Sequence, residues 1–429
     1  MSIDWYLEFV DQKYKPSKSD LVCLFRIDPA KGISMKEAAG RVASESSAGT
    51  WTTLYKLPPR VRKIMAKAFE FKGNFVKVAY PIGLWEPGNA PQLLSGIAGN
   101  IFGMKAVDGL RLIDVSLPKE YLEHYKGPSR GIEGIRKVLK VKKRPITGAV
   151  PKPKIGYTSK EHAAMGFETW MGGFDIVKDD ENLTSTSFNK FEDRVEALAK
   201  ARDRAEKLTG CQKSAFVNIT SESREMIMRA KLLHNYGFEF AMIDVLTAGV
   251  SSVQTMREVC ADFGMAIHAH RAMHAAFDRI ENHGMTMYFL AKLMRMIGID
   301  SIHVGTAVGK LVGSRHDVSA IANMIKSSHV KKSKEFLEQN WYHIKPVMPV
   351  SSGGLHPGII PKVMEILGND CCILVSGGIH GHPKGTRQGA IAAMQAIEAT
   401  MKRISISEYA KKHKELSLAL EKWGALSPI

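Results

Sequence analysis

The sequence predicts an α/β protein in which a C-terminal (β/α)8 TIM barrel follows an N-terminal α+β domain of the ferredoxin-like kind. Two observations favour this fold class. From about residue 144 onward, short apolar runs alternate with amphipathic helical stretches in a repeating order. Before residue 130, strand-like runs are interrupted by helical ones without that order. We therefore expect an N-terminal domain over residues 1–135 and a barrel domain over 136–429.

Most of the expected barrel strands follow a glycine that ends a helical stretch. Glycine is the usual left-handed helix cap because it has no Cβ that would clash. Eight short buried strands over about 280 residues fit a closed barrel better than an open, doubly wound sheet, and no GxGxxG opens the first unit. The eight apolar runs are ITGAV, FDIV, SAFVNI, AMIDV, MAIHAHR, DSIHVG, PVMPV and CCILVSGG.

The N-terminal segment is expected to form an antiparallel sheet with accompanying helices. Its strand-like runs are LVCLFRI, FVKVAYPI and LRLIDVSL, and its helical runs are SMKEAAGRVASES and APQLLSGIAGNIFG. In the barrel domain, the stretch before Gly210 shows the clearest helical period. The segment over residues 405–423 is also expected to be helical and charged. The apolar residues of the stretch before Gly210 are Val195, Leu198, Ala201, Ala205 and Leu208.

The composition is that of an ordinary globular protein, with 45% hydrophobic and 24% charged residues. It excludes intrinsic disorder, collagen-like sequence and a disulfide scaffold. No apolar run is long enough for a membrane span, and the acidic N-terminus lacks the apolar core of a secretory signal. The five cysteines show neither metal spacing nor an even disulfide pattern, which indicates the reducing cytoplasm.

The charge balance is unusual, because 60 Lys and Arg against 43 Asp and Glu give a net charge of +17. Such a charge suggests an anionic partner, which could be a nucleic acid, a membrane surface or a phosphorylated small molecule. Lysines used for solubility are the alternative. The densest basic run, 137–144, has no interleaved aromatic residues and matches no nucleic-acid motif, so it is interpreted as a solvated helix end. A nucleic-acid-binding protein would need a contiguous basic face and strongly salt-dependent binding.

Polar side chains gather where the expected barrel strands end, which is where barrels of this kind place their active sites. Taken singly, each has an ordinary structural explanation, such as a solvated lysine or an acidic helix N-terminus. Their joint placement at four strand ends is harder to explain structurally. The sets that share a strand face or follow it directly are Lys152 and Lys154; Lys178, Asp180 and Glu181; His268, His270, Arg271 and His274; Ser301, His303 and Gly305, with Lys310 in the next loop.

These residue types suit a metal-assisted reaction on a bisphosphate. The carboxylates of Asp180 and Glu181 are hard oxygen ligands suited to Mg²⁺, although two of them make a sparse site and a third ligand is expected. The glycine pairs in Ser352-Gly353-Gly354 and Ser376-Gly377-Gly378 would let backbone N–H groups approach one phosphate. Arg271 and His303 could hold a second. This combination suggests a carbanion or enediolate intermediate.

Seven motifs occur in this order along the chain: ESSAGTWTT, GNIFGMK, GFDIVKDDENLTS, HAHRAMHAAFDR, IHVGTAVGKL, SSGGLHPG and GGIHGHPKG. Together they resemble the large subunit of ribulose-1,5-bisphosphate carboxylase/oxygenase (RuBisCO). The resemblance covers nearly the whole chain, with the motifs in order. The compact length and the segments GTWTTLY and GNIFGMKAVDGLRL are more similar to the archaeal type III form than to the plant form.

The resemblance implies that CO₂ converts Lys178 to a carbamate, which completes a Mg²⁺ site with Asp180 and Glu181 and acts as the base for the C3 proton. Lys152 would then protonate the final carbanion. Lys310, on the loop after the sixth strand, would close over the site and stabilise the new carboxylate. The remaining implied roles are assistance by His270 at the C3 hydroxyl, support by Lys154, and substrate binding by Arg271, His303, Ser352, Gly353, Gly354, Ser376 and Gly377.

The resemblance also implies a homodimer or an assembly of dimers without a small subunit. CO₂ and O₂ would compete for ribulose 1,5-bisphosphate, and the pathway would be nucleotide-ribose salvage or a phosphoribulokinase-linked cycle. A non-carboxylating, RuBisCO-like enolase or isomerase is the alternative; Lys310 and the Ser352-Gly-Gly loop argue against it. The residues expected to reach into the partner subunit's site are Glu45, Thr50, Trp51 and Asn100.

Four positions depart from the family pattern. Ala48 stands where Thr is common, and Val312 where many members have Glu. Ser376 replaces a glycine of the strand-eight phosphate loop, and Ser301 replaces a histidine common in plant enzymes. None removes a catalytic group, but Val312 bears on CO₂/O₂ selectivity, and Ser376 could loosen or add one phosphate contact.

Overall fold

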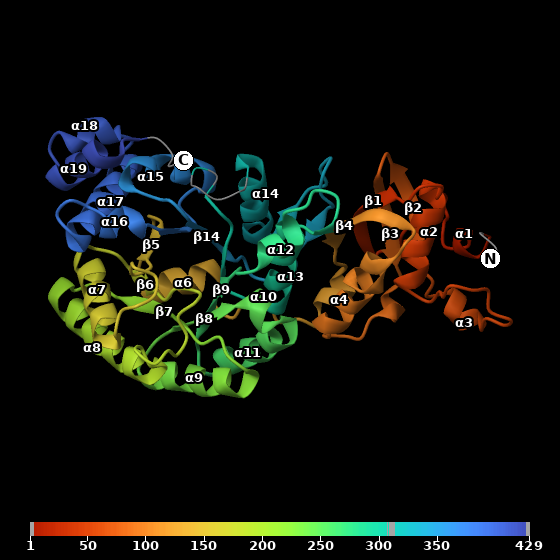
Figure 1. Ribbon diagram of the computed structural model, residues 1–429, viewed down its shortest axis with the longest axis horizontal. Coiled ribbons are helices and arrows are strands. Elements are labelled where there is room, and N and C mark those ends of the chain that lie inside the picture. Colours follow the sequence, from red (N-terminus) through yellow and green to blue (C-terminus); the bar gives the residue numbers. More distant parts are fainter. Residues whose placement is uncertain (1–3, 307, 309–313, 426–429) are drawn as a thin grey trace. The chain divides into compact units, whose positions relative to one another are not determined.

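The computed structural model describes residues 4–306, 308 and 314–425 (Figure 1). It divides into two compact units, each built from three chain segments. The first unit comprises Met1–Gly127, Met273–Ile297 and Ser327–Ile344, and the second comprises Pro128–Ala272, Gly298–Lys326 and Lys345–Ile429. Two segments from within the range expected for the barrel domain therefore pack in the first unit.

The second unit contains the predicted closed barrel, in the order β11-β14-β15-β5-β6-β7-β8-β9. Neighbouring strands pair in parallel, as at Ile176↔Ser214 and Phe240↔Ala266. All eight apolar runs expected as strands lie in it, so the predicted fold class is confirmed. The strands are β5 (Ile146–Ala149), β6 (Ile176–Lys178), β7 (Ser214–Asn218), β8 (Phe240–Asp244), β9 (Ala266–His270), β11 (Ser301–His303), β14 (Met348–Ser352) and β15 (Cys372–Leu374).

Helices surround this barrel in the expected alternation. The helix α8 ends at Gly210, whose φ of +67° confirms the left-handed cap inferred from the sequence. The longer helices are α7 (Ser159–Met171), α8 (Phe191–Thr209), α9 (Ser223–Asn235), α11 (Val250–Asp262), α14 (Arg315–Lys326), α15 (Ile360–Leu367), α17 (Thr386–Met401) and α19 (Lys414–Trp423). The short ones are α10 (Val245–Ala248), η3 (Pro357–Ile359), α16 (Gly377–His380) and α18 (Ile406–Ala410).

One end of the barrel core is closed by helix α6 (Gly131–Leu139), whose Ile135 and Leu139 pack with inward side chains such as Phe240 and Met348. The buried Asp300 carboxylate accepts backbone N–H bonds from the start of this helix, at 2.7 Å from both Arg130 and Gly131. Beyond Leu139 the lysines Lys140, Lys142 and Lys143 are exposed, as expected of a solvated helix end, whereas Arg144 is partly buried and pairs with Asp175 at 2.7 Å. The chemistry must therefore lie at the opposite, C-terminal ends of the strands.

The first unit contains a five-stranded sheet in the order β10-β4-β1-β3-β2. Its four N-terminal strands are antiparallel as expected, but β10 (Gly284–Met285) pairs in parallel with β4, so the sheet is mixed. The run KAFEFK forms β2, which the sequence analysis did not identify. The other strands are β1 (Leu21–Pro29), β2 (Lys67–Lys72), β3 (Phe75–Tyr80), β4 (Val107–Ser116), and the hairpin of β12 (His329–Val330) and β13 (Gln339–Asn340).

Helices of the first unit include both of those expected. None of the helices that the structure describes in residues 4–425 is long and apolar enough to cross a membrane. These helices are α1 (Asp4–Leu7), α2 (Met35–Glu45), α3 (Pro59–Arg62), η1 (Ile82–Leu84), α4 (Ala90–Ala98), η2 (Asn100–Gly103), α5 (Lys119–Leu122), α12 (His274–Asp278) and α13 (Met287–Ile297).

A buried ion pair joins α13 to the sheet of the first unit. The Lys292 ammonium lies 2.5 Å from the Asp114 carboxylate and donates to the Val115 carbonyl at 2.7 Å. Asp114 also accepts the Leu337 N–H at 2.8 Å. Burial raises the pKa of Asp114 and lowers the pKa of Lys292, while their mutual attraction opposes both shifts. The segment 273–297 thus joins this unit through a charge pair as well as through strand pairing, and the segment 327–344 donates a backbone hydrogen bond to the same carboxylate.

Replacing Lys292 by methionine should lower the free energy of unfolding by about 3–5 kcal/mol, because Asp114 would remain buried without its partner. Chemical denaturation measures the loss. Lys200→Met is the matched control, since Lys200 pairs with Glu196 on an exposed helix face and should change the free energy by no more than about 0.5 kcal/mol. Equal effects of the two substitutions would contradict this account.

Candidate active site

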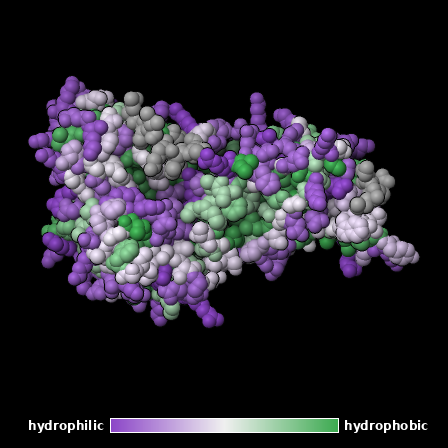
Figure 2. Space-filling model, in the orientation of Figure 1, coloured by the Kyte–Doolittle hydropathy of each residue, from purple (hydrophilic) through white to green (hydrophobic). Residues whose placement is uncertain are grey.

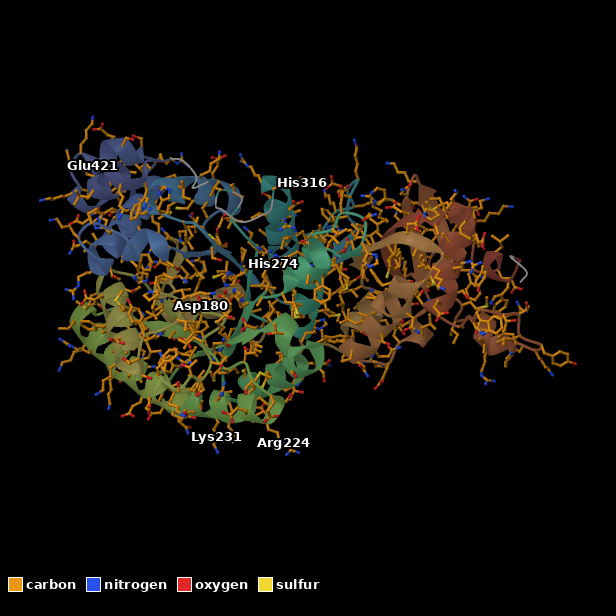
Figure 3. The ribbon with its side chains drawn as sticks, in the orientation of Figure 1. Asp180, Arg224, Lys231, His274, His316 and Glu421 are labelled. Atoms are coloured by element: carbon orange, nitrogen blue, oxygen red, sulfur yellow. The ribbon has the colours of Figure 1, made fainter. Side chains whose placement is uncertain are left out.

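A cavity of about 720 Å³ opens at the C-terminal ends of the barrel strands. Figure 3 labels Asp180 within the barrel unit, just beyond β6. Most of the residues expected at the site line this cavity, although they come from six different strand ends. The lining includes Lys152, Lys154, Lys178, Asp180, Glu181, His270, His303, Ser352, Gly353, Gly354, Ser376, Gly377 and Gly378.

Lys178 ends strand β6 with its side chain pointing into the barrel, where it is 1% exposed. Its ammonium group donates to the Asp179 carbonyl at 2.9 Å. Burial lowers the pKa of Lys178, although nearby carboxylates, Glu181 foremost, oppose the shift. The amine is therefore easier to deprotonate than an ordinary lysine, and carboxylates surround it.

Asp180 and Glu181 follow directly after Lys178. The Lys152 ammonium lies 3.1 Å from the Asp180 carboxylate. Burial alone would raise the pKa of Asp180, but the Lys152 charge and its hydrogen bond hold that pKa below its ordinary value. Asp180 is thus an anionic oxygen donor at neutral pH. Among the described residues, no group of three or more His, Cys, Asp or Glu side chains is arranged to hold a metal ion.

A buried network that the sequence analysis missed holds this loop in place. The Asp179 carboxylate accepts from Arg194 and from the Asn218 backbone N–H, both at 3.0 Å. The Asn218 side-chain amide donates to the Glu181 carbonyl at 3.2 Å. Burial would raise the pKa of Asp179, but the Arg194 charge keeps it low. Asn218 ends strand β7, and its place at a strand end is the feature of the sequence from which it could have been identified as a site residue.

His270 ends strand β9 beside the same carboxylates. Its Nδ1 lies 3.1 Å from the Asp244 carboxylate and its Nε2 lies 3.6 Å from that of Glu181. Burial and then the Lys178 charge lower the pKa of His270, although Asp244 opposes the shift. The imidazole is therefore neutral at neutral pH and can accept a proton. Asp244, at the end of β8, is a second residue that the sequence analysis did not identify.

Two further histidines form a hydrogen-bonded row. His303 Nδ1 lies 2.7 Å from the Ser352 hydroxyl, and its Nε2 lies 3.2 Å from Nε2 of His268. His268 Nδ1 in turn lies 3.0 Å from the Ser301 hydroxyl. His268 and Ser301 lie deeper in the barrel, whereas His303 and Ser352 line the cavity.

The two glycine loops bring backbone close to the cavity. Gly353 has a φ of +106° and Gly354 a φ of +71°, a conformation that side chains other than glycine rarely adopt. A Cβ on Gly378 would lie 2.4 Å from the Leu355 carbonyl, so glycine is needed for the two loops to pack together. The Ser376 hydroxyl accepts the Val150 N–H at 3.0 Å. Serine at this position therefore ties the end of β15 to the segment after β5.

Some of the expected site residues do not line the described cavity. Arg271 follows β9 with its guanidinium close to Gly305. Lys310 lies outside the described residues, as does Val312. The residues expected to serve a partner subunit belong to the first unit, where Trp51 is 67% exposed. Those residues are Glu45, Thr50, Trp51 and Asn100.

Comparison with known proteins identifies the family. The model described as the ribulose bisphosphate carboxylase large chain, catalytic domain, matches residues 131–423, and the corresponding N-terminal domain matches residues 8–121. The ribulose bisphosphate carboxylase of Pyrococcus abyssi is 49% identical, and the alignment covers 100% of this chain and 99% of that one. The chain therefore belongs to the ribulose bisphosphate carboxylase large-chain family.

Solved structures of archaeal relatives have the same fold. A dimeric archaeal Rubisco from Hyperthermus butylicus matches with a TM-score of 0.94 at 49% identity, over 99% of this chain and 100% of that one. An octameric Rubisco from Pyrococcus horikoshii, crystallised with sulfate ion, matches with a TM-score of 0.92 at 48% identity, over 98% and 97%. The predicted resemblance to the archaeal form is thus confirmed.

Replacing Ser376 by alanine should lower the free energy of unfolding by about 1–3 kcal/mol, because the Val150 N–H loses its acceptor. Urea denaturation measures this. Ser376→Thr keeps the hydroxyl and should retain most of the stability. An alanine variant as stable as the parent would show that the hydroxyl is not needed to tie the two strand ends.

Proposed function

We propose that this chain is a ribulose-1,5-bisphosphate carboxylase/oxygenase of the archaeal type III form. It adds CO₂, or O₂ in competition, to the enediolate of ribulose 1,5-bisphosphate, and carboxylation yields two molecules of 3-phosphoglycerate. One observation carries the proposal: a buried lysine between carboxylates faces two glycine loops across one cavity. The family membership supports it.

The donor atoms of the cavity fit Mg²⁺ once Lys178 is modified. Asp180 and Glu181 offer hard carboxylate oxygens, and the buried Lys178 amine lies among them without being an oxygen ligand itself. A carbamate on Lys178 would add the third anionic group that the unmodified residues do not provide. A bound Mg²⁺ would polarise the substrate oxygens and stabilise the negative charge that develops on them.

Lys178 is suited to carbamate formation because burial lowers its pKa. The neutral amine nitrogen bonds to the carbon of CO₂ and loses one proton, so the neutral side chain becomes an anion. The Asp179 backbone carbonyl, which now accepts from the amine, holds the nitrogen in place. In the proposed reaction, the carbamate takes the C3 proton of the substrate.

The other cavity residues would handle protons and phosphates. Lys152 is placed to protonate the carbanion of the product, with Lys154 supporting it, and the neutral His270 would take part at the C3 hydroxyl. Lys310 would close over the site and stabilise the new carboxylate while excluding water. The phosphates and hydroxyls would be held by Arg271, Ser352, Gly353, Gly354, Ser376 and Gly377, and His303 would act on them through its Nδ1 hydrogen bond to Ser352.

The proposed assembly is a homodimer, or a set of dimers, without a small subunit. Dimeric and octameric archaeal relatives support it. In this assembly Glu45, Thr50, Trp51 and Asn100 would complete the partner's cavity. The expected pathways, nucleotide-ribose salvage or a phosphoribulokinase-linked cycle, and the cytoplasmic location stay predictions.

Replacing Lys178 by alanine should abolish carboxylation, because no carbamate can form, while the fold persists. Fixation of radiolabelled CO₂ into acid-stable product, after preincubation with bicarbonate and Mg²⁺, measures this. Lys160→Ala, on an exposed position of α7, is the matched lysine control and should keep full activity. Full activity of the Lys178 variant would refute the carbamate role, and an inactive but folded parent would refute the function.

Replacing Lys310 by alanine should block carboxylation but spare enolisation, because the family assigns Lys310 to the carboxylate formed from CO₂. Exchange of the C3 proton with solvent measures enolisation separately from CO₂ fixation. If both rates fell equally, this division of labour would be wrong.

A further inference from the structure

The row Ser301–His268–His303–Ser352 forms one continuous chain of hydrogen bonds from the barrel interior to the cavity. Ser301 and His268 are 1% and 0% exposed, and His303 is 4% exposed. The His268 ring also stacks on Phe216 at 4.1 Å between centroids, which fixes its orientation. His303 and Ser352 line the cavity, and the Ser352 hydroxyl, at the outer end of the row, faces it.

Both imidazoles of this chain are neutral. Burial lowers the pKa of His268 and of His303 well below the ordinary value. A neutral imidazole has one N–H donor and one acceptor nitrogen. Each of the three hydrogen bonds needs one hydrogen, so the whole chain can run in only two directions.

In the outward direction, Ser301 donates to His268 Nδ1, His268 Nε2–H donates to His303 Nε2, and His303 Nδ1–H donates to Ser352. The Ser352 hydroxyl then has its hydrogen left for the cavity. In the inward direction, Ser352 donates to His303 Nδ1, His303 Nε2–H donates to His268 Nε2, and His268 Nδ1–H donates to Ser301. The Ser352 hydroxyl then donates to His303 and can only accept a hydrogen bond from a ligand.

The inner end of the hydrogen-bond chain, at Ser301, decides between its two directions. Among the residues that the structure describes, the Ser301 hydroxyl has a single hydrogen-bond partner, His268 Nδ1. In the outward direction the Ser301 hydrogen is used in that bond. In the inward direction it would be buried without an acceptor, and an unsatisfied buried donor carries a large free-energy cost. The outward direction is therefore the stable one.

We propose that His268 and Ser301 are positioning residues that make the Ser352 hydroxyl an obligatory hydrogen-bond donor to an anionic oxygen of the bound substrate. The substrate's identity, a sugar bisphosphate, rests on the proposed function. The donor role itself requires only an oxyanion in the cavity, such as a phosphate oxygen. Ser352 would hold that oxygen both before and during the reaction. Breaking the hydrogen-bond chain should therefore raise KM and leave kcat little changed.

The direction of the chain can be read from the tautomers of its two histidines. Nitrogen-15 NMR on protein labelled at histidine distinguishes protonated from unprotonated ring nitrogens. We expect His268 as the Nε2–H tautomer and His303 as the Nδ1–H tautomer, assigned by single substitutions. Ser301→Ala should weaken this preference, whereas Ser301→Thr, which keeps the hydroxyl, should preserve it. The opposite tautomers in the unmodified protein would overturn the proposal.

A matched pair at position 268 tests the consequence for binding. His268→Gln keeps an N–H donor where Nε2 lies, whereas the shorter side chain of His268→Asn cannot reach His303. The asparagine variant should raise the KM for ribulose 1,5-bisphosphate by about tenfold with kcat little changed, since one hydrogen bond to a charged group is lost. The glutamine variant should stay close to the parent.

A fall in kcat at unchanged KM in the asparagine variant would overturn the positioning role, as would equal KM values for both variants and the parent. Calorimetric titration with 3-phosphoglycerate and with inorganic phosphate measures the same loss of affinity without turnover. If the parent did not carboxylate yet bound phosphate with the expected tautomers, the proposed function would fail while the positioning role stood.

Discussion

The chemistry of this protein depends on one constraint, the burial of the Lys178 amine at the end of strand β6. A lysine ammonium is costly to bury, and carboxylates around it only partly offset that cost. The closed barrel places the amine there, because β6 is paired on both sides and Lys178, at its end, is buried against the cavity. The lowered pKa of the amine follows from this position.

A fixed polar network makes that position possible. Asp179, the residue between Lys178 and the expected metal ligands, is held by hydrogen bonds from Arg194 and from the Asn218 backbone. Asn218 extends the same network to Glu181. The carboxylates that face the cavity are therefore oriented from behind by groups on neighbouring strands, as outer partners of metal sites commonly are.

Most of the surplus positive charge lies outside the cavity at the strand ends. Figure 3 shows Arg224 and Lys231 pointing outwards from α9, and in the space-filling view hydrophilic residues cover much of the barrel unit's surface (Figure 2). Lysines and histidines of the cavity are few, and Lys152 is already paired with Asp180. The net charge of +17 suggested an anionic partner, but only a handful of those charges bears on the proposed bisphosphate.

The sequence predicted the barrel well because glycine caps and short apolar runs are local signals. It also predicted most of the cavity, since polar residues just after a strand must face one end of a barrel. The two-residue edge strand β10 was missed, because so short a strand is specified by its partner rather than by its own residues. The six-residue strand β2 was also missed. The role of Asn218 and the Ser376 hydrogen bond depend on contacts between strands, which a single sequence does not show.

The central claim is that Lys178 carries a carbamate in the active protein. A crystal structure with Mg²⁺, CO₂ and a carboxylated bisphosphate analogue would test it most directly. The predicted result is planar extra density continuous with the Lys178 Nζ atom, close to a metal ion also held by Asp180 and Glu181. A bare Lys178 amine, in a crystal with the analogue and the metal bound, would contradict it.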